Sequence, residues 1–332
     1  NTAYDNRNSV SEIENVIISS IYEQIISGNL VKAESILEES LKKYPNYSYL
    51  WIYTGNFQNT VLLNPKKSQI SWEKALEINP NSARAKILLS QLHFVTGQIT
   101  TLSKDEMNQE KSISLIKDAE INDSKNYLYS RLLGNIYRAR GEYDKSLEAY
   151  AKAQSLMEDK NSSQYNLLDL LSGHNYLFKK NFKKSRELYI QSNKDSEDGL
   201  PNMLVTFWTA HTYLYEKKYG EAIKVVDDVE IKINSLDKLD PIRKINALAN
   251  CDWQKFLTYG HSQMKEDAYE SVKKRNAHLD ELKILRSAIA SSDEEILRIS
   301  LTTEIDKGFL EIWSLILFGE FEDAFSKLKS YS

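Results

Sequence analysis

The chain has 332 residues, of which 41% are hydrophobic and 27% are charged, with only 11 glycines and 5 prolines. This composition suits continuous helix better than a β-sandwich, a barrel or a disordered chain. The net charge of −4 lacks the basic footprint of a nucleic-acid-binding domain, so no DNA or RNA partner is expected.

Three features bear on the compartment. No apolar run approaches the ~18 residues that a membrane-spanning helix requires. The sequence begins with a polar, asparagine-rich stretch without methionine, which suits a mature chain whose leader has been removed. The single cysteine, Cys251, cannot form an internal disulfide, and we interpret it as a small buried hydrophobe. An exported or cell-envelope protein and a cytoplasmic one both fit these features.

The N-terminal part of the chain predicts paired helices after a short lead. Residues 1–12 have no hydrophobic periodicity and are predicted to form a polar tether. From Ile13 onward apolar residues recur at helical spacing, and a first helix pair is expected over about 14–47. A second pair is expected up to Pro80, and the first helix of a third pair runs from Ala83 until Gly97 ends it.

The third pair contains an insertion of about ten residues. Ala119 follows Ala75 by 44 positions, from 75 to 119, whereas Ala153 follows Ala119 by 34, from 119 to 153. Ser103 and Glu106 have the spacing of a capping box. We therefore predict that the insertion lengthens the second helix at its N-terminal end and does not form a free loop.

Residues 127–158 are the clearest copy of the recurring unit. Gly134 lies in the middle of the first helix, where glycine costs about 1 kcal/mol relative to alanine, so we expect the paired helix to pass too close for a Cβ there. Gly141 fits the left-handed position that ends the first helix. The recurring positions are Leu133, Gly134, Tyr137, Gly141, Tyr143, Ser146, Tyr150 and Ala153.

Two further pairs follow, and the pattern then changes. Asp240 and Pro241 suit an N-cap and the first position of a helix. Beyond them the sequence predicts three long helices, over about 242–264, 266–290 and 292–318. A short last helix is expected after Gly319.

The recurring unit resembles the tetratricopeptide repeat (TPR), a helix, a tight turn and a second helix that stack into an array. The resemblance covers about six to seven degenerate repeats and implies an all-α fold, a right-handed α-solenoid with longer C-terminal helices. It predicts a polar tether over 1–12, a TPR array of about six repeats over 13–239, and divergent TPR-like hairpins over 240–332. An independent helical domain over 240–332 is the alternative.

The resemblance also implies a binding surface on the first helices, which line the concave face in this family. Arg131, Asn135 and Arg138 share one helix face by their spacing alone. The complete set of expected groove residues is Tyr53, Asn56, Arg84, Gln91, Arg131, Asn135, Arg138, His174, Phe178, Trp208, His211 and Tyr215. They predict a non-catalytic scaffold for a protein or peptide with acidic or aromatic groups. A regulatory sensor, in which a small peptide or ligand changes the pitch of the solenoid, is the alternative.

Chaperone-binding members of the family hold a terminal carboxylate with a lysine and an asparagine of one repeat and an asparagine of the next. Arg131 and Asn135 resemble the first two of these residues. Leu171 occupies the third place, so the resemblance does not extend to that clamp. The alternative is a purely structural role, in which the arginines pair with neighbouring carboxylates and Trp208 lies in the core.

No local motif for catalysis or metal binding is present. The histidines belong to no HExxH, paired-cysteine or Ser/His/Asp-like motif. His174 and His211 fall on successive first helices, which pack about 10 Å apart, too far for a shared zinc without a third element. We expect no enzyme activity, no metal and no cofactor. An enzyme would require a convergent cluster of titratable groups in the C-terminal helices. The oligomeric state is left open.

Overall fold

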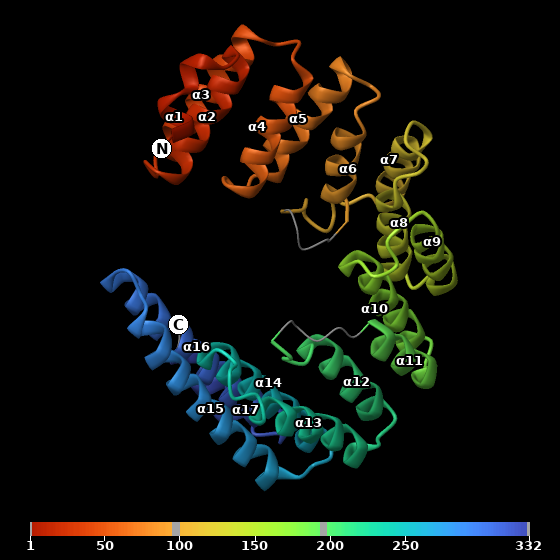
Figure 1. The fold of residues 1–332 in the computed structure, drawn as a ribbon, viewed down its shortest axis with the longest axis vertical. Helices are drawn as coiled ribbons and strands as arrows, with labels where there is room; N and C mark the ends of the chain where they lie inside the picture. Colours follow the sequence, from red (N-terminus) through yellow and green to blue (C-terminus); the bar gives the residue numbers. More distant parts are fainter. Residues whose placement is uncertain (1, 95–99, 193–197, 331–332) are drawn as a thin grey trace. The chain divides into compact units, whose positions relative to one another are not determined.

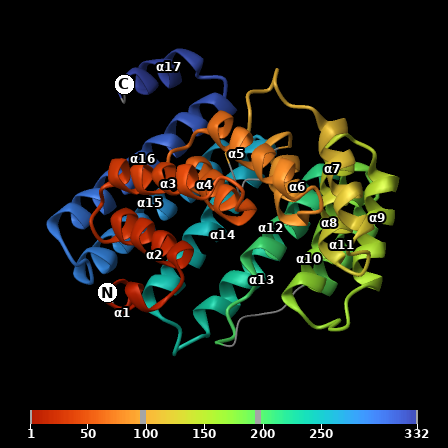
Figure 2. The same cartoon turned by 90° about the horizontal axis from the view of Figure 1, so that it is seen from above.

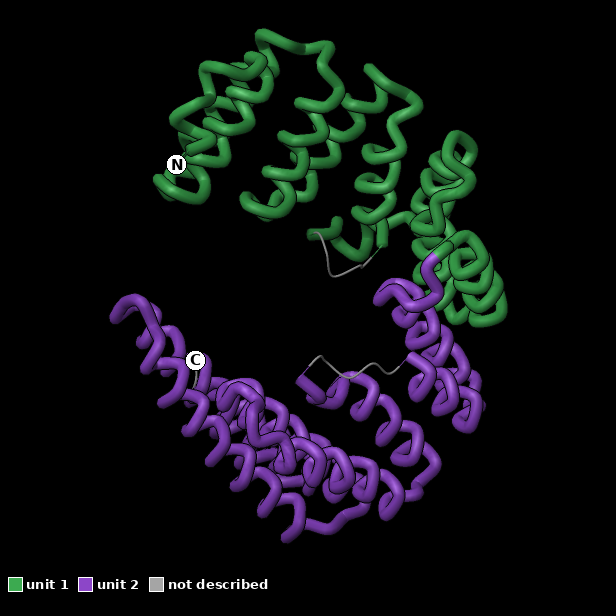
Figure 3. The backbone as a smooth tube through the Cα atoms, viewed as in Figure 1, with its two compact units in different colours: residues 1–158 green, residues 159–332 purple. Residues whose placement is uncertain are grey.

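The computed structural model describes residues 2–94, 100–192 and 198–330, and every regular element in this part of the chain is a helix (Figure 1, and in a second view Figure 2). Two compact units, residues 1–158 and 159–332, divide the chain (Figure 3). The predicted all-α fold is confirmed. The boundary between the compact units lies between residues 158 and 159. The predicted division at residue 240 stays a prediction.

Unit 1 is a series of helix pairs. Its elements are α1 Thr2–Asp5, the 3-10 helix η1 Arg7–Ser9, α2 Glu12–Ile25, α3 Leu30–Lys43, α4 Ser48–Thr60, α5 Pro65–Ile78, α6 Ala83–Leu92, α7 Gln109–Ile121, α8 Tyr127–Ala139 and α9 Tyr143–Ser155. The pairs are α2 with α3, α4 with α5, α6 with α7, and α8 with α9. These are the four pairs that the sequence predicts.

Unit 2 continues the same pairing with longer helices. Its elements are α10 Ser163–Phe178, α11 Phe182–Ser192, α12 Met203–Tyr215, α13 Tyr219–Asn234, α14 Pro241–His261, α15 Lys265–Ala288, α16 Asp293–Leu317 and α17 Phe321–Lys329. Helix α15 packs against both α14 and α16, and the two views show α15 and α16 side by side (Figure 1, Figure 2). The three long helices predicted after Pro241 are confirmed. None of the described helices is long and apolar enough to cross a membrane.

Close helix pairing depends on a glycine that faces a large ring. A Cβ on Gly134 would lie 2.5 Å from Cδ1 of Tyr150 and closer still to Cε1. Gly173 meets Tyr189 in the same way, with a Cβ 2.5 Å from Cε1. Ser146 also donates a hydrogen bond of 2.7 Å to the Gly134 carbonyl, which joins α9 to α8. The predicted reason for glycine at position 134 is therefore confirmed.

The turns inside the pairs share one backbone conformation. Gly28, Gly141 and Gly319 have φ of +67°, +76° and +77°, so the left-handed position predicted for Gly141 is confirmed. Other turns place a residue with a Cβ there, including Lys180 with φ of +60°. The full set of such non-glycine residues in the described chain is Leu63, Lys180, Lys217 and Gln263. The hairpin geometry thus fixes the turn even where the sequence lacks glycine.

The insertion in the third pair does not lengthen α7, so that prediction is wrong. Helix α7 begins at Gln109, with Asn108 as its N-cap, and residues 100–108 form a turn flanked by irregular chain. The side chain of Ser103 bonds to Glu106 without starting a helix. Asn59 of α4 holds the segment by bonding both to the NH of Thr100 at 2.9 Å and to its carbonyl at 2.7 Å. Gly97, the predicted end of the first helix, lies outside the described residues.

The N-terminal residues contact α2. Tyr4 of α1 stacks on Tyr22 of α2 with ring centroids 3.7 Å apart. Asn15 donates a hydrogen bond of 3.0 Å to the carbonyl of Arg7 in η1. Helical periodicity cannot be recognised in a stretch this short, so neither helix was predicted, and the tether over 1–12 stays a prediction.

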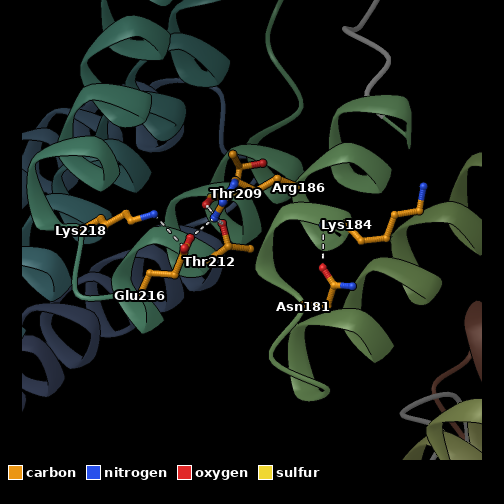
Figure 4. A network of polar contacts seen from close by, with 7 residues as sticks. All are labelled: Asn181, Lys184, Arg186, Thr209, Thr212, Glu216 and Lys218. Atoms are coloured by element: carbon orange, nitrogen blue, oxygen red, sulfur yellow. Dashed lines mark hydrogen bonds and ion pairs between the residues drawn. The ribbon is translucent and has the colours of Figure 1, made fainter.

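Polar contacts connect consecutive pairs within unit 2. Arg186 of α11 donates a hydrogen bond of 3.0 Å to Thr212 of α12 and forms an ion pair with Glu216 (Figure 4). Lys218 binds the other oxygen of Glu216 at 2.9 Å. Asn181 caps the start of α11 by accepting a bond from the Lys184 NH. Arg186 therefore joins α11 to α12.

Candidate functional site

The expected groove residues lie on the first helices of five pairs. Tyr53 and Asn56 are on α4, Arg84 and Gln91 on α6, and the residues from Arg131 to Arg138 on α8. These belong to unit 1. The remaining residues, on α10 and α12, are His174, Phe178, Trp208, His211 and Tyr215, and they belong to unit 2. Each unit therefore carries its own candidate surface.

The surface of unit 1 centres on α8. The hydroxyl of Tyr150, from the paired helix α9, donates a hydrogen bond of 2.7 Å to Oδ1 of Asn135. Burial raises the pKa of Tyr150, and the charge and hydrogen bond of Arg138 and the charge of Arg131 act in the opposite direction. Both guanidinium groups are therefore close to the Tyr150 hydroxyl. The bond from Tyr150 therefore fixes the orientation of the Asn135 amide.

Arg138 is the most informative member of this cluster. Its Nε atom is buried and has no hydrogen-bond partner among the described residues. No carboxylate in the described chain lies within 4 Å of its guanidinium, whereas the neighbouring Arg140 forms ion pairs with Glu110 and Glu142. The alternative that Arg138 merely pairs with a neighbouring carboxylate is therefore wrong for this residue.

The upstream residues contribute less. The hydroxyl of Tyr53 bonds to Ser20 and Gln24 of α2, and burial raises the pKa of Tyr53, so this residue packs two pairs together. Gln91 is 8% exposed and offers little surface to a partner. Asn56 is half-buried and Arg84 is exposed, and both are accessible on their helices.

A run of rings forms the surface of unit 2. His174 of α10 lies edge-on to Trp208 of α12 at a centroid distance of 4.3 Å. The ring centroid of Phe207 is 5.2 Å from that of Trp208 and 4.0 Å from that of His211, on which it stacks. The Tyr215 ring follows, with its centroid 6.3 Å from that of His211. This surface is largely apolar, and the exposed Tyr215 lies at its end.

The two histidines are held in place by protein groups. Nδ1 of His174 is 2.8 Å from the Tyr189 hydroxyl, and this histidine is 7% exposed. Nδ1 of His211 is 3.0 Å from the Phe207 carbonyl, and burial holds the pKa of His211 below its usual value. His211 is therefore neutral at physiological pH. His174 is buried against Trp208, behind the other rings of the run. This corrects its predicted place on the groove surface.

Sequence reasoning missed a small pocket beside this run. It has a volume of about 220 Å³ and lies between α12 and α14. Its lining residues are Met203, Leu204, Phe207, Asn250 and Gln254. Of these residues, Phe207 is next in sequence to the predicted groove residue Trp208. The two amides lie on α14, where the pattern loosens, so no sequence signal pointed to them.

The C-terminal helices also contain a partly buried contact between a histidine and a carboxylate. Nδ1 of His278 on α15 is 2.7 Å from Oδ2 of Asp252 on α14, and this bond raises the pKa of His278. Cys251 precedes Asp252, and burial raises the pKa of its thiol to about 12, which keeps it protonated. The contact joins two helices without an activated nucleophile. Among the described residues, no group of three His, Cys, Asp or Glu side chains could hold a metal ion.

Comparison with known proteins places the fold. No family profile and no curated protein sequence matches the chain. A solved tetratricopeptide repeat protein from Parabacteroides merdae is similar at a TM-score of 0.55 and 16% identity, over 88% of this chain and 98% of that one. The C-terminal part of a TPR protein from Cytophaga hutchinsonii gives 0.54 and 12%, over 86% and 98%. The chain has a TPR fold.

The TPR fold assigns each helix to the first or the second position of a repeat. Helices α4, α6, α8, α10 and α12 are first helices, and α5, α7, α9, α11 and α13 are second helices. The predicted resemblance and the helical solenoid are thereby confirmed. The groove residues stay a prediction, and their chemistry is taken up as a proposal.

Proposed function

We propose that the chain is a non-catalytic scaffold that binds protein or peptide segments on its first helices. In this proposal, α8 of unit 1 takes acidic groups through Arg131, Asn135 and Arg138. The ring run of unit 2 takes apolar or aromatic groups. The observation that carries the proposal is the buried Nε of Arg138, which has no hydrogen-bond partner among the described residues.

The energetics favour an anion at Arg138. A buried donor without a partner costs about 1–3 kcal/mol, and more when the group is charged. A carboxylate from a partner would form charge-assisted hydrogen bonds with the part of the half-buried guanidinium that solvent reaches, beside its hydrogen bond to Tyr150. The Asn135 amide, fixed by Tyr150, would add a second donor on the same helix face. These donors on one face of α8 support the assignment of this surface to an acidic group of the partner.

The aromatic surface of unit 2 suits partner burial. Phe178 and Tyr215 are 49% and 59% exposed, and Tyr and Phe side chains supply large contact area at low entropic cost. The pocket of about 220 Å³ beside Phe207 has room for one apolar side chain. Trp208 packs on the core residues Leu170 and Tyr189, so it anchors this surface from within.

The proposal is tested with peptides selected from a random library on the immobilised full chain. We expect the selected peptides to be enriched in Asp and Glu and in large apolar residues. Charge reversal at Arg131→Glu with Arg138→Glu should weaken binding by about 100-fold or more, because each hydrogen bond to a charged group contributes about 1.5–3 kcal/mol. Binding to the unchanged chain should also weaken between about 50 and 500 mM NaCl.

The control has the same change in charge at another place. Lys117→Glu with Lys125→Glu alters two exposed lysines of unit 1 outside the first helices. This variant should bind the peptides as the unchanged chain does. Equal losses in both double variants would show that the effect is one of net charge, and would contradict a site on α8.

Unit 2 is tested separately with the exposed rings. Phe178→Ala and Tyr215→Ala should weaken the binding of apolar peptides at low and high salt alike, because salt hardly screens the burial of apolar surface. Trp208→Ala should do the same, but its packing on the core requires a parallel check of helicity. Unchanged peptide affinity in all three variants would contradict a binding surface on these rings. The sensor alternative stays a prediction.

A further inference from the structure

The last helix pair of unit 2 presents an apolar surface that the array leaves uncovered. Helix α16 carries a stripe at spacings of i, i+4, i+8, i+11 and i+15, which all fall on one side of a helix. The stripe consists of Leu301, Ile305, Phe309, Ile312 and Ile316. No charged residue falls on this stripe between 301 and 316, a length of about 22 Å along the helix axis.

Helix α17 adds to this surface. Phe321, Phe325 and Leu328 share one face of α17 at i, i+4 and i+7 and are 65%, 59% and 55% exposed. Trp313 stacks beside Phe309 on α16 at a centroid distance of 6.1 Å. We call the apolar residues of α16 and α17 the terminal face.

The earlier pairs show what normally covers such a face. Helix α12 packs against α11, and α14 packs against both α12 and α13. Among the described residues, no helix covers the apolar residues of α16 and α17 in that way.

We propose that the terminal face is the interface of a two-fold dimer with a second copy of this chain. The exposed fractions of these side chains, at about 150–200 Å² for a whole large side chain, amount to about 700 Å² on the two helices together, somewhat more than half of it on α16. That exceeds the ~300–600 Å² of the largest patch on a typical monomer. It also matches a standard interface, which buries about 800 Å² per partner with its polar rim included.

The stripe is suited to pairing with itself. In a two-fold interface the same surface meets itself, so residue i contacts j and j contacts i. Two antiparallel α16 helices centred on Phe309 would set Leu301 against Ile316 of the second copy. Apolar residues then meet apolar residues along about four turns of helix, with Phe309 close to the two-fold axis.

The first experiment measures mass against concentration. Sedimentation of the full chain from about 1 to 100 µM should show a species of twice 38.4 kDa, since an interface of this size supports micromolar or tighter affinity. Ile305→Glu with Phe309→Glu should weaken the dimer at least 100-fold without loss of helicity, because both side chains are exposed in the single chain. Ile231→Glu, at an exposed apolar position on α13, is the matched control and should leave the dimer intact.

The second experiment tests the two-fold geometry by cross-linking. The one native cysteine, Cys251, is buried and does not interfere. Phe309→Cys should cross-link to its own copy on mild oxidation. Leu301→Cys should do so only when mixed with Ile316→Cys, because two Leu301 positions would lie about 24 Å apart.

Three results would overturn the proposal. These are a monomer throughout the concentration range, a double glutamate variant that dimerises like the unchanged chain, and species larger than a dimer that grow with concentration. The dimer is independent of peptide binding. Salt should leave it unchanged or strengthen it, whereas salt should weaken peptides on α8.

Discussion

Gly134→Ala should destabilise unit 1, although alanine is the better helix former by about 1 kcal/mol. The added Cβ would lie 2.5 Å from Cδ1 of Tyr150. The ring cannot give way, because Tyr150 is 0% exposed and its hydroxyl is bonded to Asn135. Overpacking of this kind costs about 1–3 kcal/mol, so after the helix gain the net loss should be up to about 2 kcal/mol. Gly134→Leu should cost more.

The assay is urea unfolding of the full chain followed by circular dichroism, with hydrogen exchange of peptides from 127–158. Exchange is needed because a repeat array need not unfold in one step. Gly220→Ala on α13 is the matched control, since a Cβ there meets nothing within 4 Å. It should be neutral or stabilising by up to about 1 kcal/mol.

A double variant separates overpacking from other causes. Tyr150→Leu removes the ring and is destabilising alone, but Gly134→Ala should cost little in its presence. The two changes should therefore be non-additive, as expected for residues in contact. Additive losses, or equal unfolding midpoints for Gly134→Ala and Gly220→Ala, would refute the proposed reason for the glycine.

Three further predictions follow from packing, turn geometry and the partly buried contact between a histidine and a carboxylate. Leu133→Ala, at a buried position, should cost about 2–5 kcal/mol in urea unfolding, whereas Lys160→Ala on the surface should be near neutral, and equal midpoints would contradict the register. Lys180→Gly should raise the free energy of unfolding by up to about 1 kcal/mol, because φ is +60° there and glycine adopts that conformation without a Cβ penalty; a lower free energy of unfolding would exclude strain. The bond to Asp252 raises the folded-state pKa of His278 above 6.5, so the stability it contributes is present below pH 6.5 and is lost as pH rises through the folded pKa. Melting temperature against pH should therefore show the unchanged chain exceeding His278→Gln in acid and converging with it in alkali, and a constant difference would contradict the linkage.

The pairing of helices could be predicted from the sequence because each pair repeats a few packing requirements. Gly134 opposite Tyr150 and the glycine of the following turn are local signals, and each has a packing reason. The starts of α14 and α16 were predictable for a similar reason, since Asp240 with Pro241 and Ser292 mark them, whereas α15 begins without a capping side chain. These features depend on residues close together in the chain.

The failures concern contacts between distant residues. Asn59 holds the insertion at Thr100, 41 positions away, and no local pattern reveals this. Tyr4 holds the N-terminal helix on Tyr22 through one ring contact. On the candidate surface, position in the repeat placed His174 correctly on its helix but could not show its burial beneath Trp208, which depends on the next pair.

The most direct test of the proposed scaffold is to locate a bound peptide. A selected acidic peptide carrying a benzophenone beside its Asp or Glu would be irradiated with the full chain, and the cross-linked residues would be identified by mass spectrometry. The proposal predicts cross-links within α8, around Arg131 and Arg138, that disappear when both arginines are replaced by glutamate. Cross-links confined to the second helices, or to the C-terminal hairpins after Pro241, would contradict it.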